Sequence, residues 1–147
     1  MTAIYDGLQF RTRLEAQWAA FFDLAKWEWR VNPVVVGDWA PDFRVTFSCS
    51  HSECGGSHTL LVAVLPLTQP EDFKTHPSLR HFYGINDANK DDYKGLDISI
   101  DAGAAFGTSP EATTWEMSHG AGGGIESVSA WVDHAEVLWS QAASFVK

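Results

Sequence analysis

The sequence has 147 residues, 45% of them hydrophobic and 20% charged, which is typical of a globular protein and not of a disordered or fibrous one. At this length we expect one domain spanning residues 1–147, because a second independent core needs a longer chain. The formal net charge of −9 excludes the simplest class of nucleic-acid binder, a uniformly basic domain held by phosphate contacts.

The charge is unevenly distributed along the chain. Residues 1–44 carry five basic and six acidic residues, a net charge of −1. Residues 45–147 carry five basic and thirteen acidic residues, a net charge of −8. This asymmetry suggests two faces with different partners.

The sequence also bears on the compartment. No apolar run approaches the roughly 20 residues of a membrane-spanning helix, and the first residues lack the basic-then-apolar pattern of a signal peptide. The two cysteines, Cys49 and Cys54, would close only a short loop, so free thiols or metal ligands in a reducing cytosol fit better than a disulfide. We expect a cytoplasmic protein without membrane contact, whose oligomeric state the sequence leaves open.

The first half of the chain predicts a helix followed by three strands. Apolar residues at helical spacing predict a helix over residues 8–25. Strict alternation predicts half-buried strands over residues 27–31 and 43–47. The uncharged run 60–65 predicts a central strand buried on both faces, which forms a long-looped hairpin with the strand before it.

The second half predicts two helical segments and two strands. In chain order we expect a helical segment over residues 70–82 that Pro77 interrupts, a strand over 96–100, a loop over 102–110, a strand over 113–117, a glycine-rich turn over 120–124 and a helix over 129–146. The whole order of elements predicts a mixed α/β or α+β domain, with a small mixed central sheet flanked by helices.

The first helix and the following hairpin resemble a known pattern. Residues 5–23, Tyr-Asp-Gly-Leu-Gln-Phe-Arg-Thr-Arg-Leu-Glu-Ala-Gln-Trp-Ala-Ala-Phe-Phe-Asp, look like the first helix of a PD-(D/E)XK nuclease-like family common in bacteriophages and actinobacterial genomes. In that family a tryptophan- or tyrosine-rich strand, Pro-Asp-Phe and a strand carrying Glu-x-Lys follow. Residues 27–31 and 41–43 fit the first two of these elements. The resemblance covers residues 4–66 and implies a restriction-endonuclease-like fold and a phage or prophage origin.

The resemblance implies a site in which two carboxylates hold Mg²⁺ or Mn²⁺ and a lysine orients the attacking water. Asp42 matches the family aspartate, and Glu15 matches a carboxylate of the helix. Ala63 and Leu65 occupy the positions of the missing glutamate and lysine, and residues 59–68 contain no charged residue. The resemblance therefore implies a vestigial catalytic site and a pseudoenzyme that acts by binding.

Alternatives remain open for these residues. Glu15 is also explained by an exposed ion pair with Arg11 at i−4 spacing, and Asp42 by hydrogen bonds to backbone donors at a strand end. A carboxylate supplied by Glu71 or Asp72 would instead give an active metal-dependent endonuclease or exonuclease with relocated ligands.

The loop between the hairpin strands contains a second set of candidate ligands. Cys49, His51, Cys54 and His58 lie within ten residues and are the ligand types of a structural Zn²⁺ site. The chain would then be a zinc-stabilised interaction module. The alternative is a polar loop with solvated histidines, because the spacing is not that of the usual zinc motifs.

Three further residues are candidate binding residues. Arg11 and Arg13 lie at the start of the predicted helix, and Trp39 lies near Asp42 as a base-stacking candidate. The acidic second part of the chain favours a host protein with a basic surface as the partner, with DNA as the alternative.

Overall fold

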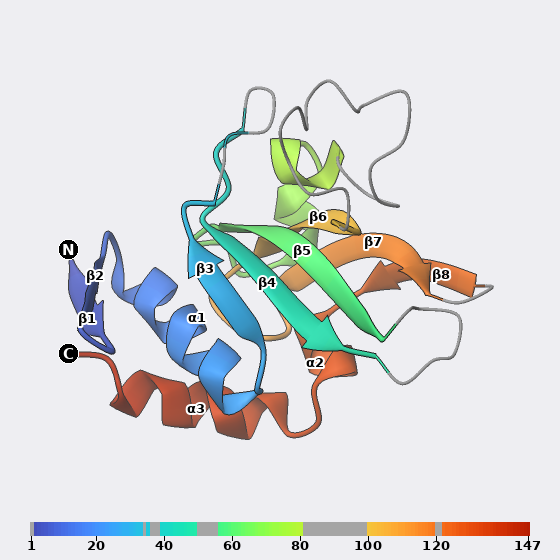
Figure 1. Ribbon diagram of the computed structural model, residues 1–147. Helices are drawn as coiled ribbons and strands as arrows, with labels where there is room; N and C mark the ends of the chain where they lie inside the picture. Colours follow the sequence, from blue (N-terminus) through green and yellow to red (C-terminus); the bar gives the residue numbers. More distant parts are fainter. Residues whose placement is uncertain (1, 34, 36–38, 50–55, 81–99, 120–121) are drawn as a thin grey trace.

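A six-stranded mixed sheet forms the centre of the computed structural model, which describes residues 2–33, 35, 39–49, 56–80, 100–119 and 122–147 (Figure 1). Its strands lie side by side in chain order: β3 (Glu28–Val31), β4 (Phe43–Ser48), β5 (Ser57–Val64), β6 (Ala102–Phe106), β7 (Thr113–His119) and β8 (Gly122–Glu126). The β5–β6 pair is parallel, and the other four pairs are antiparallel. A separate hairpin joins β1 (Ala3–Tyr5) and β2 (Leu8–Phe10). The fold is therefore mixed α+β, as the order of elements predicted.

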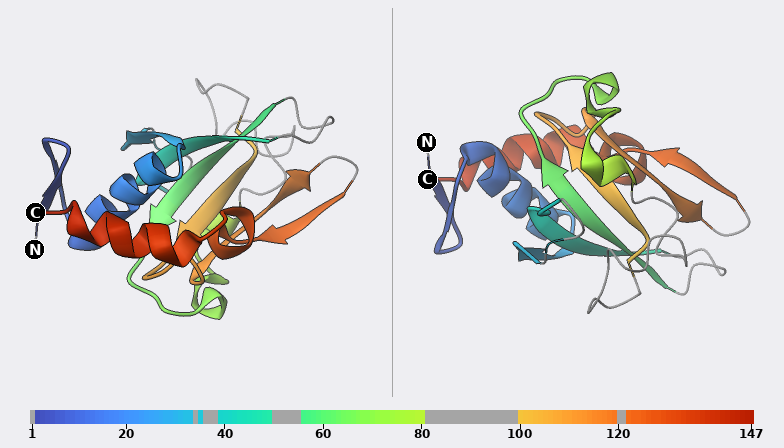
Figure 2. Two further views of the ribbon diagram at one scale, coloured as in Figure 1. Left: turned by 90° about the horizontal axis from the view of Figure 1, so that it is seen from below. Right: turned by 90° about the horizontal axis from the view of Figure 1, so that it is seen from above.

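Helices cover one face of the sheet. α1 (Arg13–Leu24), α2 (Val128–Trp131) and α3 (Ala135–Ser144) pack on this face, and α1 and α3 lie side by side (Figure 2). The opposite face carries two short 3₁₀ turns, η1 (Pro70–Phe73) and η2 (Pro77–Arg80), from the crossover between the parallel strands. None of the helices in the described residues is long and apolar enough to cross a membrane.

The main core lies between the sheet and the helices. Its largest fully buried side chains are aromatic and come from α1 and from the strands β4, β6 and β7: Trp18, Phe21, Phe22, Phe43, Phe106 and Trp115. Trp18 also donates a hydrogen bond from Nε1 to the carbonyl oxygen of Gly107 at 2.9 Å. The strict alternation expected of β4 is confirmed, because alternate residues of this strand are buried against the helices.

A second, smaller core lies on the other face of β5. Trp39, Leu61, Ala63 and Ile100 form it, and Leu65 packs against it. With Leu60, Val62 and Val64 buried on the helical side, β5 is covered on both faces, which confirms the prediction from its uncharged run.

The chain before α1 differs from the predicted helix over residues 8–25. Asp6 and Gly7 have φ angles of 51° and 76°, and they form the two-residue turn of the β1–β2 hairpin, so residues 8–10 are a strand. α1 starts at Arg13 because Thr12 caps it, with its side chain accepting a hydrogen bond from the Glu15 backbone N–H at 3.1 Å. The apolar periodicity continued into the hairpin because Phe10 joins the same core.

Other predicted elements also differ. The expected loop over 102–110 contains β6, since Ala102–Phe106 is buried between β5 and β7 despite its small residues. The predicted turn over 120–124 overlaps β8, which starts at Gly122. The predicted helix over 129–146 is divided into α2 and α3, because His134 has a left-handed φ of 56°. The segment 70–82 forms two 3₁₀ turns, and of the predicted strand 96–100 only Ile100, which is not in a strand, is described.

Candidate functional site

Asp42 lies just before β4, and hydrogen bonds of its backbone connect it to β5 and to the residue that follows β3. Its backbone N–H donates to the carbonyl oxygen of Val62 at 2.8 Å, and its own carbonyl oxygen accepts from Asn32 N–H at 2.9 Å. Its Oδ2 accepts a hydrogen bond from the backbone N–H of Val64 at 2.7 Å. This last bond is the one expected of an aspartate that satisfies a backbone donor at a strand end.

The β4–β5 register shows what lies opposite this aspartate. Phe43 pairs with Val62, so Asp42 lies opposite Ala63 one step further along the antiparallel pair. Ala63 is 3% exposed and belongs to the smaller core, against which Leu65 also packs. The two positions that the resemblance assigns to a glutamate and a lysine thus carry apolar side chains, and Ala63 lies opposite Asp42.

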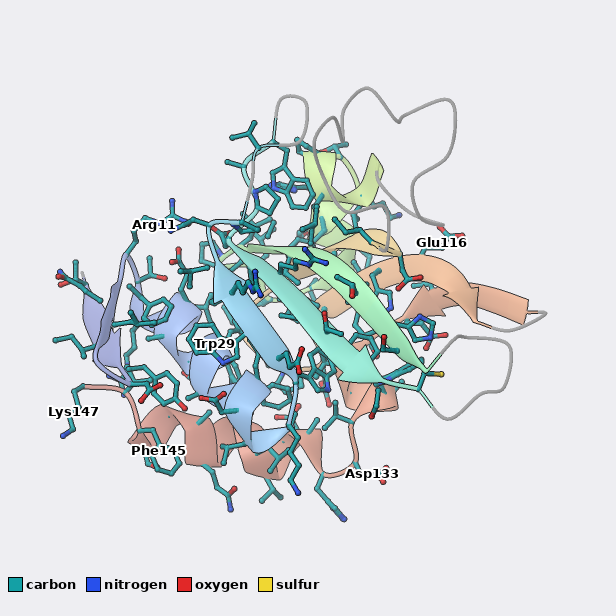
Figure 3. All side chains as sticks on the ribbon, viewed as in Figure 1. Arg11, Trp29, Glu116, Asp133, Phe145 and Lys147 are labelled. Carbon is teal, nitrogen blue, oxygen red and sulfur yellow. The ribbon has the colours of Figure 1, made fainter. Side chains whose placement is uncertain are left out.

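Arg11 joins Asp42 to Glu15. Thr12 starts α1 and thereby places Glu15 in its first turn, on the side of the helix that faces Asp42. Arg11 Nη2 contacts Asp42 Oδ1 and lies 3.4 Å from Glu15 Oε1, at the end of the sheet where β4 begins (Figure 3). The i−4 pair between Arg11 and Glu15 that the sequence predicted is present, but the Glu15 side chain is only 12% exposed and not the exposed residue expected. A cavity of about 200 Å³ adjoins these three side chains.

The electrostatics of the cluster follow from this geometry. Burial raises the pKa of Glu15, and the negative charge of Asp42 raises it further, while Arg11 opposes both effects. The pKa of Arg11 is raised, chiefly by the charge of Glu15. One guanidinium therefore offsets only part of the charge of two carboxylates, and the side chain of Glu15 is only 12% exposed.

His76 is a neighbour of this cluster that the sequence did not indicate. Burial lowers its pKa, and the charge of Asp42 acts in the opposite direction. Its Nδ1 accepts the backbone N–H of Ser78 at 3.1 Å and lies 2.9 Å from Ser78 Oγ, and its ring meets Trp39 edge to face. These contacts fix the ring in the crossover between β5 and β6. His76 lies far from Trp39 and Asp42 in sequence, and no local motif indicates that they are close.

The described residues of the cluster do not fit a divalent cation. Mg²⁺ and Mn²⁺ need several oxygen ligands. Here both carboxylate oxygens of Asp42 already have partners, because the guanidinium of Arg11 contacts Oδ1 and the backbone N–H of Val64 donates to Oδ2. Over the described ranges, no group of three histidine, cysteine, aspartate or glutamate residues is placed to hold a metal. The donor set is that of an ion-paired cluster in which Arg11 supplies the positive charge.

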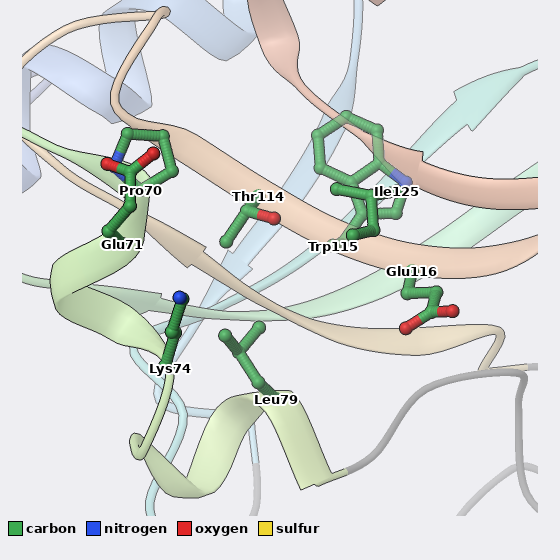
Figure 4. A pocket seen from close by; sticks show the side chains of 8 residues that line it. All are labelled: Pro70, Glu71, Lys74, Leu79, Thr114, Trp115, Glu116 and Ile125. Carbon is green, nitrogen blue, oxygen red and sulfur yellow. The ribbon is translucent and has the colours of Figure 1, made fainter.

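Glu71 lies at a different place from Asp42. It lines a cavity of about 300 Å³ on the face opposite α1 and α3, between the 3₁₀ turns and the last two strands (Figure 4). The side chain of Ile125, 76% exposed, lies on the other side of this cavity. Glu71 is therefore not among the residues that line the cavity at Asp42, where a relocated ligand would be needed.

The zinc hypothesis stays a prediction, because two of its four ligands, His51 and Cys54, lie outside the described residues. Cys49 directly follows β4, where its N–H donates to the carbonyl oxygen of Gly56 at 2.9 Å. His58 is buried in β5 between the rings of Phe47 and Trp131, and its Nδ1 lies 3.5 Å from Asp101 Oδ2.

Two of the three predicted binding residues, Arg13 and Trp39, make contacts within the protein, and their part in binding stays a prediction. Arg13 donates to the carbonyl oxygens of Ala143 at 3.0 Å and Val146 at 3.5 Å, so it caps the carboxyl end of α3. Trp39 is only 5% exposed and packs in the smaller core. Arg11 and Arg13 are both exposed, and the side chain of Arg11 is 68% exposed.

Comparison with known proteins assigns no family to this chain. Neither the family models, nor the curated proteins, nor the solved structures contain a match to this chain. Its function is therefore argued from its own residues.

Proposed function

We propose that this chain is a nuclease-like protein of the PD-(D/E)XK type, of phage or prophage origin, that does not cleave DNA and acts by binding a partner. The observation that carries the proposal is the arrangement around Asp42. This aspartate faces Ala63, where the family pattern has a glutamate, and its carboxylate contacts Arg11.

The order of elements supports the nuclease-like part of the proposal. α1 is followed by the antiparallel strands β3, β4 and β5, and Asp42 immediately precedes β4. This is the order of helix, aromatic-rich strand, Pro-Asp-Phe and central strand on which the resemblance rests. A restriction-endonuclease-like fold is the specific form of α+β architecture that we propose for it.

The chemistry of the cluster supports the absence of cleavage. In-line attack on a phosphodiester needs a metal-bound water and a group that stabilises the developing negative charge. Ala63 and Leu65 supply neither a ligand nor a positive charge, and Arg11 already forms ion pairs with Glu15 and Asp42. The guanidinium preserves the geometry of the carboxylates at the position where a metal would otherwise hold them together.

The charge distribution supports a partner with a basic surface. Residues 45–147 have a net charge of −8, and several of their acidic side chains are exposed on the described surface, among them Glu71, Glu111, Asp133 and Glu136. An acidic surface attracts a basic protein surface and repels nucleic acid. We therefore propose a host protein with a basic surface as the partner, in preference to DNA.

The experiment is a cleavage assay on plasmid and single-stranded DNA with Mg²⁺ or Mn²⁺, run with the wild type and with Asp42→Ala. We expect both proteins to leave the DNA intact. Cleavage by the wild type that Asp42→Ala abolishes would refute the proposal, because it would show that ligands outside the described cluster restore the site.

A further inference from the structure

The two edges of the six-stranded sheet differ in the side chains that they carry. β3 forms one edge and β8 the other (Figure 1). β3 includes Glu28 and Arg30, and charged side chains on an edge strand oppose pairing with a further strand. β8 has the sequence Gly-Gly-Gly-Ile-Glu, in which the final Glu126 is the one charged residue. Of the two edges, β8 is therefore the less protected.

The outer edge of β8 is open in the described part of the chain. Within these residues β8 pairs with β7 alone, and no other backbone hydrogen bond involves residues 122–126. Gly124 has a φ of 145°, which favours glycine, and a Cβ added there would meet no atom within 4 Å. Glycine in a strand often marks a place where another backbone approaches closely. β8 thus offers an edge with room for a further strand.

A large apolar side chain lies exposed on this edge strand. Ile125 is 76% exposed, more than any other large hydrophobic residue in the described ranges. It lies at the cavity of about 300 Å³ on the face opposite α1 and α3 (Figure 4). Pro70, Leu79 and Thr114 also line this cavity, and each of them is partly exposed. The cavity therefore has accessible apolar walls directly beside the open edge.

Charged groups surround these apolar walls. Glu71, Glu116 and Lys74 line the cavity, so two carboxylates and one ammonium give it a net charge of −1. Glu71 is exposed, and among the described residues its carboxylate forms no ion pair and accepts no hydrogen bond. A lysine or arginine side chain has an apolar stem and a charged head. Such a side chain can place its stem against Ile125 and its head near Glu71.

We propose that β8 accepts an extended basic segment of a partner protein as an additional strand, with a lysine or arginine of that segment in the cavity beside Ile125. In strand addition, main-chain hydrogen bonds supply affinity and pockets for alternate side chains supply specificity. The inference rests on the basic partner of the proposed function and names how that partner binds. A second copy of the chain fits less well, because each copy carries a net charge of −9.

The experiment uses the peptide acetyl-Val-Lys-Val-Lys-Val-Lys-Val-amide as the probe. Its binding is measured by isothermal titration calorimetry and by the shifts of backbone amide resonances. We expect one site per chain, a dissociation constant below about 1 mM, and the largest shifts in residues 122–126. A peptide with glutamate in place of lysine should bind about tenfold more weakly or not at all. Of two forms N-methylated at the valines or at the lysines, one should lose binding, because only every second N–H of an added strand points to β8.

Matched variants test the residues of the site. Ile125→Lys should weaken binding about tenfold or more, because it removes the apolar contact and adds a like charge. Val137→Lys is its control, since Val137 is 55% exposed on α3. Glu71→Gln should weaken binding about threefold, and Glu136→Gln on α3 should leave it unchanged. The replaced side chains are all exposed, so each variant should melt within about 2 °C of the wild type.

Several results would overturn the proposal. These are no binding of the basic peptide at about 10 mM, equal binding of the acidic peptide, equal binding of both N-methylated forms, or unchanged affinity in Ile125→Lys. A wild-type dimer that Ile125→Lys dissociates would also overturn it, because a second copy would then occupy the edge. Failure of the proposed function is seen separately. DNA cleavage would refute that function and leave peptide binding intact, whereas absent peptide binding with uncut DNA would refute this inference alone.

Discussion

Replacing Arg11 by methionine tests whether its guanidinium occupies the position of a metal ion between the carboxylates of Glu15 and Asp42. Methionine keeps the length of the apolar stem and removes the charge. In the structure, Arg11 Nη2 contacts Asp42 Oδ1 and lies 3.4 Å from Glu15 Oε1. The variant leaves two carboxylates next to each other without a positive charge, one of them on a side chain only 12% exposed.

The expected loss of stability is moderate because Arg11 is largely exposed. An ion pair at the protein surface contributes about 0–1 kcal/mol. A hydrogen bond to a charged group contributes about 1.5–3 kcal/mol when buried, and solvent screening reduces this for a side chain that is 68% exposed. We expect Arg11→Met to lower the free energy of unfolding by about 1–2 kcal/mol at neutral pH, measured by urea denaturation.

The same variant should gain a response to divalent cations. If Mn²⁺ occupies the vacated position with a dissociation constant of about 1 mM, then 10 mM Mn²⁺ stabilises the folded state by about 1.4 kcal/mol. For a protein of this size, this corresponds to a rise of roughly 3–6 °C in the melting temperature. The wild type should shift by less than about 1 °C, because its own guanidinium fills the position.

Arg13→Met is the matched control, because it removes the same charge two residues away. Arg13 donates to the carbonyl oxygens of Ala143 and Val146, and among the described residues it forms no ion pair with a carboxylate. Arg13→Met should not gain a response to Mn²⁺. Equal shifts in Arg11→Met and in the wild type, or an Arg11→Met protein as stable as the wild type, would refute the reasoning about the cluster.

Three further predictions follow from contacts elsewhere in the chain and from the titration of Glu15. Asp23→Ala should cost about 1–2 kcal/mol in urea denaturation, because Asp23 accepts hydrogen bonds from both Tyr5 Oη and Trp29 Nε1, and an unchanged midpoint would contradict this. Gly107→Ala should cost about 2 kcal/mol or more by the same measurement, since its Cβ would overlap the carbonyl oxygens of Leu67 and Ala112, and a cost below about 0.5 kcal/mol would show that the backbone yields. The pKa of Glu15 is raised in the folded state, so between pH 4.5 and the folded-state pKa this group binds more protons in the folded protein than in the unfolded one. The free energy of unfolding should therefore fall as pH rises from 4.5 through the folded-state pKa, and then level off. Glu15→Gln should remove this fall, and a fall of the same size in both proteins would assign it to another group.

Strong local patterns predicted the centre of the fold. The alternation of residues 43–47 and the uncharged run 60–65 predicted β4, β5 and their antiparallel pairing, because burial on one or both faces leaves a direct trace in sequence. The start of α1 was missed because the helical spacing extends over residues that the Asp6-Gly7 turn places in a strand. A two-residue Asp-Gly loop is a strong hairpin signal and outweighs three residues of periodicity.

β6 had no such trace. Ala-Gly-Ala-Ala-Phe has low strand propensity, and it is a strand because two neighbouring strands and the layers on both faces enclose it. The parallel pairing of β5 with β6 was not predicted either, because a long connection separates the two strands and no local pattern encodes their pairing.

The candidate site was predictable in its residues but not in its connections. Glu15 and Asp42 were identified from the motif, and the Arg11–Glu15 pair from helical spacing. The contact of Arg11 with Asp42 joins residues 31 positions apart and depends on how α1 docks beside β4.

A titration of Mg²⁺ and Mn²⁺ into the wild type by calorimetry, with DNA cleavage followed in the same samples, tests the central claim most directly. We expect no saturable binding in the micromolar range and no cleavage products, because Ala63 and Leu65 replace the glutamate and lysine of the motif and Arg11 forms ion pairs with the remaining carboxylates. Saturable micromolar binding together with cleavage that depends on Asp42 would contradict it.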